Sequence, residues 1–275
     1  MKTPEARSTT LTKNRSAVVE DPWEELRQFT DARIALGRCG ASLPLASVLS
    51  LRMAHAQARD AVHLPLDMDR LAEELAELGL PILRLHSAAA DRSTYLTRPD
   101  LGRRLDQASQ RMLYEQATGE GCDLVLVVGD GLSSRAISEN AVPFLRLFTG
   151  LSQQFSGLRL GSICLVGNCR VATGDEVGAL LGARMVAMLI GERPGLSSPN
   201  SMGVYLTSAP KVGTSDEARN CISNVREGGL PIAEGVRKLA YLIEEAQRLG
   251  TTGVGLKDRM RGEYLPFRGS LALES

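Results

Sequence analysis

Apolar runs of strand length recur through the second half of the chain. They are DLVLVV (123–128), SICLV (162–166), RMVAMLI (184–190) and the shorter GVYLTS (203–208). Helical patterns begin near Ser134, at Thr173 and near Leu230, with a polar loop ahead of the last one. Continuously apolar strands that alternate with helices are typical of a parallel sheet covered on both faces. We therefore expect an α/β, Rossmann-like domain over residues 115–275.

The first half of the chain has a mainly helical pattern. Helical segments are predicted at 21–29, 45–59, 66–79 and 98–118, and the apolar segment PILRL (81–85) predicts one strand. We therefore expect a mostly helical N-terminal extension over residues 21–114. Residues 1–20 are polar, basic and without periodicity, which predicts a mobile tail.

Composition and charge exclude several classes of protein. The 275 residues are 43% hydrophobic and 23% charged, with a formal net charge of zero. A nucleic-acid binder normally has a basic surface, so this balance does not support one. The apolar runs are too short to cross a membrane, and the N-terminus lacks the apolar core of a secretory signal. Five scattered cysteines without a CxxC pair indicate reduced thiols in the cytoplasm.

Glycine-rich turns follow three of the predicted strands. They occupy residues 129–134, 167–171 and 191–195. Ligands of open α/β sheets bind at the carboxyl ends of the strands, and glycine lets the backbone approach a ligand closely. Three such turns side by side predict a site for a flat or bulky ligand.

Common enzyme motifs are absent. GDGLSS (129–134) ends in Ser134 where a dinucleotide site has a third glycine, and no GxxxxGK[ST] phosphate loop occurs. A serine hydrolase needs a base near its nucleophile, but all three histidines lie in the first half of the chain, and no metal-ligand spacing is present. Two other classes stay open: a stand-alone Rossmann-like enzyme acting on a nucleotide or small metabolite, and a non-catalytic scaffold.

The stretch LIGERPGLSSP (189–199) ends a predicted strand with a charged pair, Glu192 and Arg193. Glycines and prolines surround this pair. A surface loop without a function would not require so many turn-forming residues. We interpret Glu192 as a binding residue whose carboxylate accepts hydrogen bonds from ligand amides or hydroxyls.

Several motifs resemble the small (light) subunit of ethanolamine ammonia-lyase. They include ARIALGRCGASLP (32–44), RVATGDEVG (170–178), IGERPGLSSP (190–199) and RNCISN (219–224). The resemblance spans residues 26–260 in order. It implies a required but non-catalytic subunit of an adenosylcobalamin-dependent enzyme that converts ethanolamine into acetaldehyde and ammonia by radical chemistry.

The resemblance also implies a partner and a binding mode. In this family the large subunit is a TIM barrel that carries the substrate site, and the small subunit covers the lower side of the corrin and its nucleotide tail. The resemblance implies a dodecamer of six large and six small subunits, in which the extension over 21–114 would contact the large subunit. The chain lacks the Asp-x-His-x-x-Gly motif of enzymes that replace the lower base with histidine. We therefore expect dimethylbenzimidazole to stay on cobalt.

The matching motifs imply three cofactor-binding residues and no catalytic or metal-binding residue on this chain. Val171 would pack on the cofactor, Glu192 would accept a hydrogen bond from it, and Cys221 would supply a backbone or thiol contact. Arg193, Ser197 and Ser198 are secondary candidates. Small subunits of the family can carry an N-terminal segment for packaging in a bacterial microcompartment. The tail here has no amphipathic period, so the sequence favours a cytoplasmic location over packaging.

Overall fold

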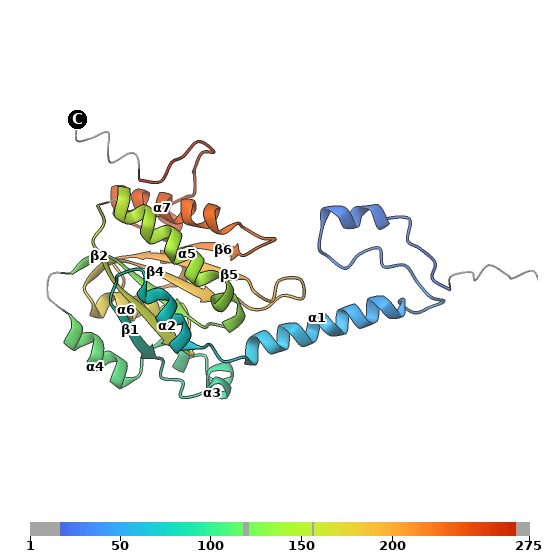
Figure 1. Ribbon diagram of the computed structural model, residues 1–275, viewed down its shortest axis with the longest axis horizontal. Coiled ribbons are helices and arrows are strands. Elements are labelled where there is room, and N and C mark those ends of the chain that lie inside the picture. Colours follow the sequence, from blue (N-terminus) through green and yellow to red (C-terminus); the bar gives the residue numbers. More distant parts are fainter. Residues whose placement is uncertain (1–16, 118–120, 156, 268–275) are drawn as a thin grey trace, which may run out of the picture. The chain divides into compact units, whose positions relative to one another are not determined.

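The computed structural model describes residues 17–117, 121–155 and 157–267. The chain divides into two compact units, one ending at Ala56 and one covering Gln57–Ser275 (Figure 1). Apart from residues 17–20, the predicted mobile tail lies outside the described residues.

The unit that ends at Ala56 has almost no core of its own. It contains the 3-10 helix η1 (Glu24–Phe29) and the first part of helix α1 (Leu45–His63). Among its described residues, only Pro44 and Ala54 are buried. The exposed large apolar side chains of this unit are Val18, Val19, Trp23, Leu26, Phe29, Ile34, Leu43, Leu45, Leu49 and Met53.

The unit that begins at Gln57 is built on a sheet of six strands in the order β1-β3-β2-β4-β5-β6. The strands are β1 (Ile82–His86), β2 (Cys122–Gly129), β3 (Leu160–Gly167), β4 (Ala183–Gly191), β5 (Met202–Ser208) and β6 (Arg219–Val225). The first four are parallel, whereas β5 is antiparallel to β4 and β6 is antiparallel to β5. The predicted α/β class is confirmed, and the sheet is mixed rather than wholly parallel.

The antiparallel pairs follow from short connections. A parallel crossover needs about a dozen residues or more, usually with a helix. Residues 192–201 and 209–218 connect β4 to β5 and β5 to β6, and neither segment contains an α-helix. The sequence pattern predicted a polar loop where β6 lies, and that prediction is wrong. In β6, Ile222 and Val225 are buried while Cys221 and Ser223 are exposed, so only one face of the strand is apolar.

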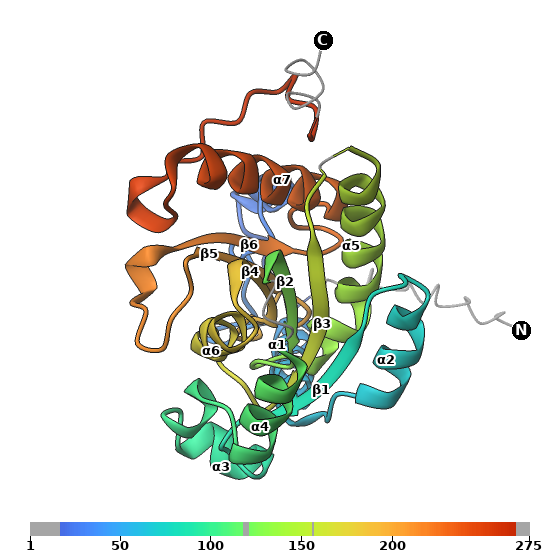
Figure 2. The same cartoon turned by 90° about the vertical axis from the view of Figure 1, so that its left-hand side faces the viewer.

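Helices cover both faces of the sheet, as predicted (Figure 2). The core on one face includes buried residues of α2 (Met68–Ala76), α5 (Ser134–Phe155) and α7 (Ile232–Leu249). The core on the other face includes buried residues of α4 (Gln107–Gln116) and α6 (Ala172–Leu180). The remaining short elements are α3 (Arg92–Thr97), η2 (Leu101–Arg103), η3 (Asp216–Ala218) and η4 (Gly253–Gly255). No helix in the described ranges is long and apolar enough to cross a membrane.

The helix predicted over 98–118 is two elements, η2 and α4. Asp106 separates them because its extended backbone starts α4 and its carboxylate accepts a hydrogen bond from the Ser109 N–H at 2.7 Å. The segment predicted as a strand at 81–85 forms β1, which pairs with β3 at the edge of the sheet.

Candidate functional site

The three predicted glycine turns lie side by side at the carboxyl edge of the sheet. Gly129, which ends β2, is in register with Val166 of β3 and Ile190 of β4. The turns after β2 and β4 touch through their backbones, since a Cβ on Gly191 would lie 2.1 Å from the Ser133 carbonyl oxygen. Glycine is therefore required at this position. The prediction that these turns form one edge is confirmed.

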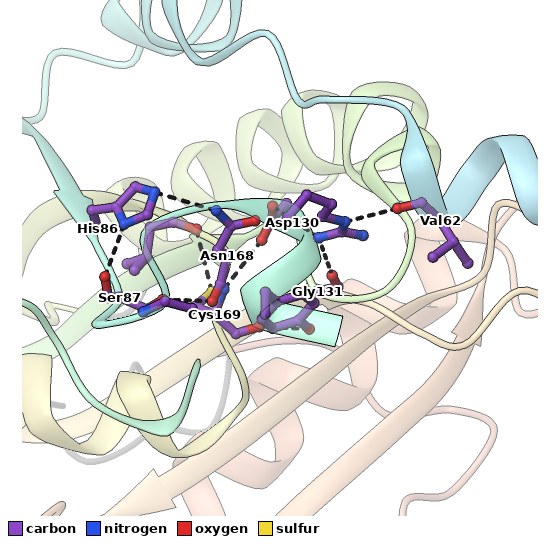
Figure 3. A network of polar contacts seen from close by, with 11 residues as sticks. Val62, His86, Ser87, Asp130, Gly131, Asn168 and Cys169 are labelled. Carbon is purple, nitrogen blue, oxygen red and sulfur yellow. Dashed lines mark hydrogen bonds and ion pairs between the residues drawn. The ribbon is translucent and has the colours of Figure 1, made fainter. Parts of the chain in front are cut away.

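The loop between β3 and α6 is fixed by buried hydrogen bonds (Figure 3). Asp130, the residue after β2, accepts a hydrogen bond from the Cys169 N–H at 3.2 Å. Asn168 has a left-handed backbone (φ 52°), and its carbonyl accepts the Ser87 hydroxyl at 2.6 Å. These bonds hold the loop in a conformation that non-glycine residues rarely adopt.

Arg92, at the start of α3, pairs with the Asp130 carboxylate. Its Nη1 lies 3.2 Å from Oδ2 of Asp130 and donates to the Gly131 carbonyl at 2.8 Å, while its Nε donates to the Val62 carbonyl at 2.7 Å. The two paired side chains are 19% and 8% exposed, so water screens the pair little. Burial raises the pKa of Asp130, and Arg92 and neighbouring backbone N–H groups act in the opposite direction.

Tyr95 of α3 joins this pair to the loop. The ring is fully buried, and its hydroxyl donates to the Cys169 carbonyl at 3.1 Å. The guanidinium carbons of Arg92 and Arg170 lie 4.8 and 4.5 Å from the ring centre. Burial raises the pKa of Tyr95, so the phenol stays protonated and can donate its hydrogen bond.

Val171, the first predicted cofactor contact, occupies the N-cap position of α6. Its side chain provides no cap for the helix, and it is half-buried against the core on the α6 face. The preceding residue is anchored, since the Arg170 N–H donates to the Gly102 carbonyl at 2.7 Å. Val171 therefore has a fixed position, with part of its apolar side chain at the surface.

Glu192, the second predicted contact, follows directly after β4. Its carboxylate accepts hydrogen bonds from the Ser223 hydroxyl at 2.6 Å, the Asn224 N–H at 3.2 Å and the Ser201 hydroxyl. Gly203 leaves room for it, since a Cβ there would lie 3.0 Å from Oε1 of Glu192. Glu192 thus connects the end of β4 to β6 and to Ser201, the residue before β5.

Cys221, the third predicted contact, is an exposed residue of β6 paired with Tyr205 of β5. Partial desolvation and the nearby Glu192 raise the pKa of the Cys221 thiol, although a hydrogen bond from Tyr205 opposes them. The thiol is therefore protonated near neutral pH and is a poor nucleophile.

The structure brings Glu192 and Cys221 onto one surface. Ser223, which donates to Glu192, lies two residues beyond Cys221 in β6 and so faces the same side of the sheet. Val171 and Tyr205 pack against the same core cluster on that side. We call Glu192, Tyr205, Cys221 and Ser223 the β5–β6 patch.

The secondary candidates lie in the loop between β4 and β5. Arg193 and Ser197 are exposed, and Ser198 closes a tight turn with Gly195 through backbone hydrogen bonds of 3.1 and 3.2 Å. The described contacts do not tie Arg193 to the β5–β6 patch, so its role as a binding residue stays a prediction.

The sequence interpretation missed the residues that support the predicted contacts. Tyr205, Ser201 and Ser223 carry no motif, and their roles depend on antiparallel pairing that was not predicted. Asp130 could have been found, because an acidic residue directly after a buried strand resembles Glu192 in its position.

Comparison with known proteins identifies the family. The family of ethanolamine ammonia-lyase light chains matches residues 20–257. The chain belongs to this family. It is 53% identical to the ethanolamine ammonia-lyase small subunit of Azotobacter vinelandii over 260 residues, covering 94% of this chain and 96% of the relative. It is 54% identical to that of Pseudomonas putida strain W619 (87% and 88% covered) and 52% identical to that of Ralstonia nicotianae (88% and 90% covered).

The predicted resemblance is therefore confirmed over most of the chain. The chain is a small subunit of an ammonia-lyase, which is a carbon–nitrogen lyase.

Proposed function

We propose that this chain binds adenosylcobalamin against the large subunit of an ammonia-lyase that converts ethanolamine into acetaldehyde and ammonia. The observation that carries the proposal is the β5–β6 patch. It places a carboxylate acceptor at the carboxyl edge of the sheet, where α/β proteins bind ligands, and an exposed thiol and a half-buried aromatic ring on the neighbouring strands β6 and β5.

The residues present fit a corrin. A corrin is broad and flat, and its rim carries amide groups that donate hydrogen bonds. An ionised carboxylate offers about four acceptor positions, and three protein groups already occupy positions on Glu192. One position remains for a ligand amide. No Cβ on Gly203 crowds that carboxylate.

When bound, the cofactor supplies the radical chemistry of the reaction. The residues of this chain hold the corrin in place and cover part of its surface. Glu192 orients the corrin through one amide, Val171 contributes apolar contact, and Cys221 contributes a neutral contact because its thiol stays protonated. We further propose that dimethylbenzimidazole remains on cobalt.

The exposed apolar side chains of the unit that ends at Ala56 support the proposal that a protein partner binds there. An isolated soluble domain rarely exposes so many large apolar side chains within one short segment. We propose that this unit, with other parts of residues 21–114, contacts the large subunit, in an assembly of six large and six small subunits located in the cytoplasm.

Reconstitution tests the proposed function. We expect the purified chain to be inert with ethanolamine and adenosylcobalamin, and a mixture with the large subunit to release acetaldehyde and ammonia. The large subunit with the small subunit of Azotobacter vinelandii is the matched positive control. Turnover by this chain alone would contradict the proposal. So would an inactive mixture in which the large subunit works with the control.

A further inference from the structure

Arg170 carries a charge that no carboxylate neutralises within the described ranges. Its guanidinium stacks on Tyr95 at 4.5 Å, and its Nε is buried without a hydrogen-bond partner. None of the ion pairs among the described residues includes Arg170. The side chain is half-buried, so water solvates only part of the cation. A partly desolvated cation of this kind favours an anionic ligand.

Arg92, which stacks on the same ring, differs from Arg170 because a carboxylate neutralises its charge. It stacks at 4.8 Å and forms an ion pair with Asp130. Two guanidinium groups thus contact one buried ring, but among the described residues only one carboxylate, that of Asp130, pairs with them. The stacking accounts for the position of Arg170, and its buried Nε has no hydrogen-bond partner among the described residues.

Arg170 directly precedes Val171, a predicted cofactor contact. Its backbone is fixed by the Gly102 carbonyl, and the Thr173 hydroxyl donates to the same carbonyl at 2.8 Å. The guanidinium is therefore held at the start of α6, on the side of the sheet that carries the β5–β6 patch.

We propose that Arg170 binds the phosphodiester in the nucleotide tail of cobalamin. This inference rests on the proposed function. The amides of the corrin rim are neutral, and the phosphodiester is the anionic group of the nucleotide tail. Arginine matches the geometry of a phosphate better than lysine does, because its planar donors can form two parallel hydrogen bonds.

The test compares two corrinoids on the assembled complex of both subunits. Cyanocobalamin carries the nucleotide tail, and dicyanocobinamide lacks it, so equilibrium dialysis gives a dissociation constant for each. For Arg170→Met we expect cyanocobalamin binding to weaken about ten- to hundredfold, the range of a charged hydrogen bond. Dicyanocobinamide binding should change less than about twofold. Arg170→Lys should restore part of the loss because it keeps the charge.

Controls separate this role from a structural one. Arg184→Met removes an exposed arginine at the amino end of β4, the opposite edge of the sheet, and should change neither constant. Thermal unfolding of each variant checks the fold. Equal weakening of both corrinoids in Arg170→Met, or no change in cyanocobalamin binding, would overturn the inference while the proposed function stands.

Two further outcomes are decisive. If the wild-type complex binds neither corrinoid, the proposed function fails and this inference fails with it. Inorganic phosphate tests a free anion as the occupant. If it stabilises the wild type against heat but not Arg170→Met, while both bind cyanocobalamin equally, Arg170 holds free phosphate and the assignment to the nucleotide tail is wrong.

Discussion

Asp130 and Glu192 occupy equivalent places on neighbouring strands but have opposite surroundings. Each follows the glycine that ends a parallel strand, Gly129 of β2 or Gly191 of β4. Asp130 is buried and paired with Arg92, whereas Glu192 is half-buried and accepts from two hydroxyls and one backbone N–H. The same position at a strand end therefore serves in one case to fix a loop and in the other to present a surface.

The difference lies in what covers each strand end. The segment between β1 and α4 brings Arg92 and Tyr95 over Asp130 and removes it from solvent. Beyond β4 the chain returns as two antiparallel strands whose exposed face carries Cys221 and Ser223. The β5–β6 patch is thus open to a ligand, whereas the Asp130 carboxylate is not.

Asp130→Ala should give the largest effect on stability. It leaves Arg92 poorly solvated and unpaired, and breaking a buried pair of this kind costs about 3 kcal/mol or more. We expect the free energy of unfolding in urea to fall by about that amount. Glu139→Ala, which removes an exposed carboxylate paired with Arg135, is the control and should cost less than about 1 kcal/mol. Similar losses in both variants would show that Asp130 is not a structural residue.

Glu192→Ala should weaken cofactor binding more than it lowers stability, the reverse of what we expect for a structural residue such as Asp130. We expect the dissociation constant of cyanocobalamin from the assembled complex to rise about tenfold, the value of one charged hydrogen bond. The free energy of unfolding should fall by only about 1 kcal/mol, because most of its partners are exposed. Glu192→Gln keeps the size of the side chain, and its dissociation constant should lie between those of the wild type and Glu192→Ala. Unchanged cobalamin affinity in Glu192→Ala would refute the contact.

Cofactor binding should have its smallest effect at Cys221, where it slows alkylation of the thiol. The rate of this alkylation should also depend on pH. Because the thiolate is the reactive form and its pKa is raised, alkylation by iodoacetamide should have a midpoint above the usual value of about 8.5. In the assembled complex, cyanocobalamin should slow the reaction several-fold, measured by mass spectrometry of the Cys221 peptide. Cys122, a half-buried cysteine at the amino end of β2 and outside the patch, is the internal reference. Equal rates with and without cobalamin would place the cofactor elsewhere.

The parallel part of the fold was predictable because burial leaves a local signature. The strands β2, β3 and β4 are covered on both faces, so each is an unbroken apolar run in the sequence. The strand β6 escaped prediction because only Ile222 and Val225 face the core, and its other face is polar. The break between η2 and α4 could have been read from Asp106, a typical N-cap residue.

The site was predictable only in its outline. Glycines at strand ends indicated the carboxyl edge, and the motifs singled out Val171, Glu192 and Cys221. The partners of Glu192 come from residues 201, 223 and 224, which only the folded hairpin brings together. The stack of Arg92, Tyr95 and Arg170 joins segments far apart in the chain, and no local pattern encodes such a contact.

The unit that ends at Ala56 has a consequence for how the protein is made. More than half of the exposed large apolar side chains in the described ranges lie in this short segment. If this unit contacts the large subunit as proposed, a chain synthesised without that partner exposes an apolar surface, and such surfaces promote aggregation. Matched synthesis of the two subunits would then protect the small one, and recombinant yield should depend more on co-expression than on the stability of the sheet domain.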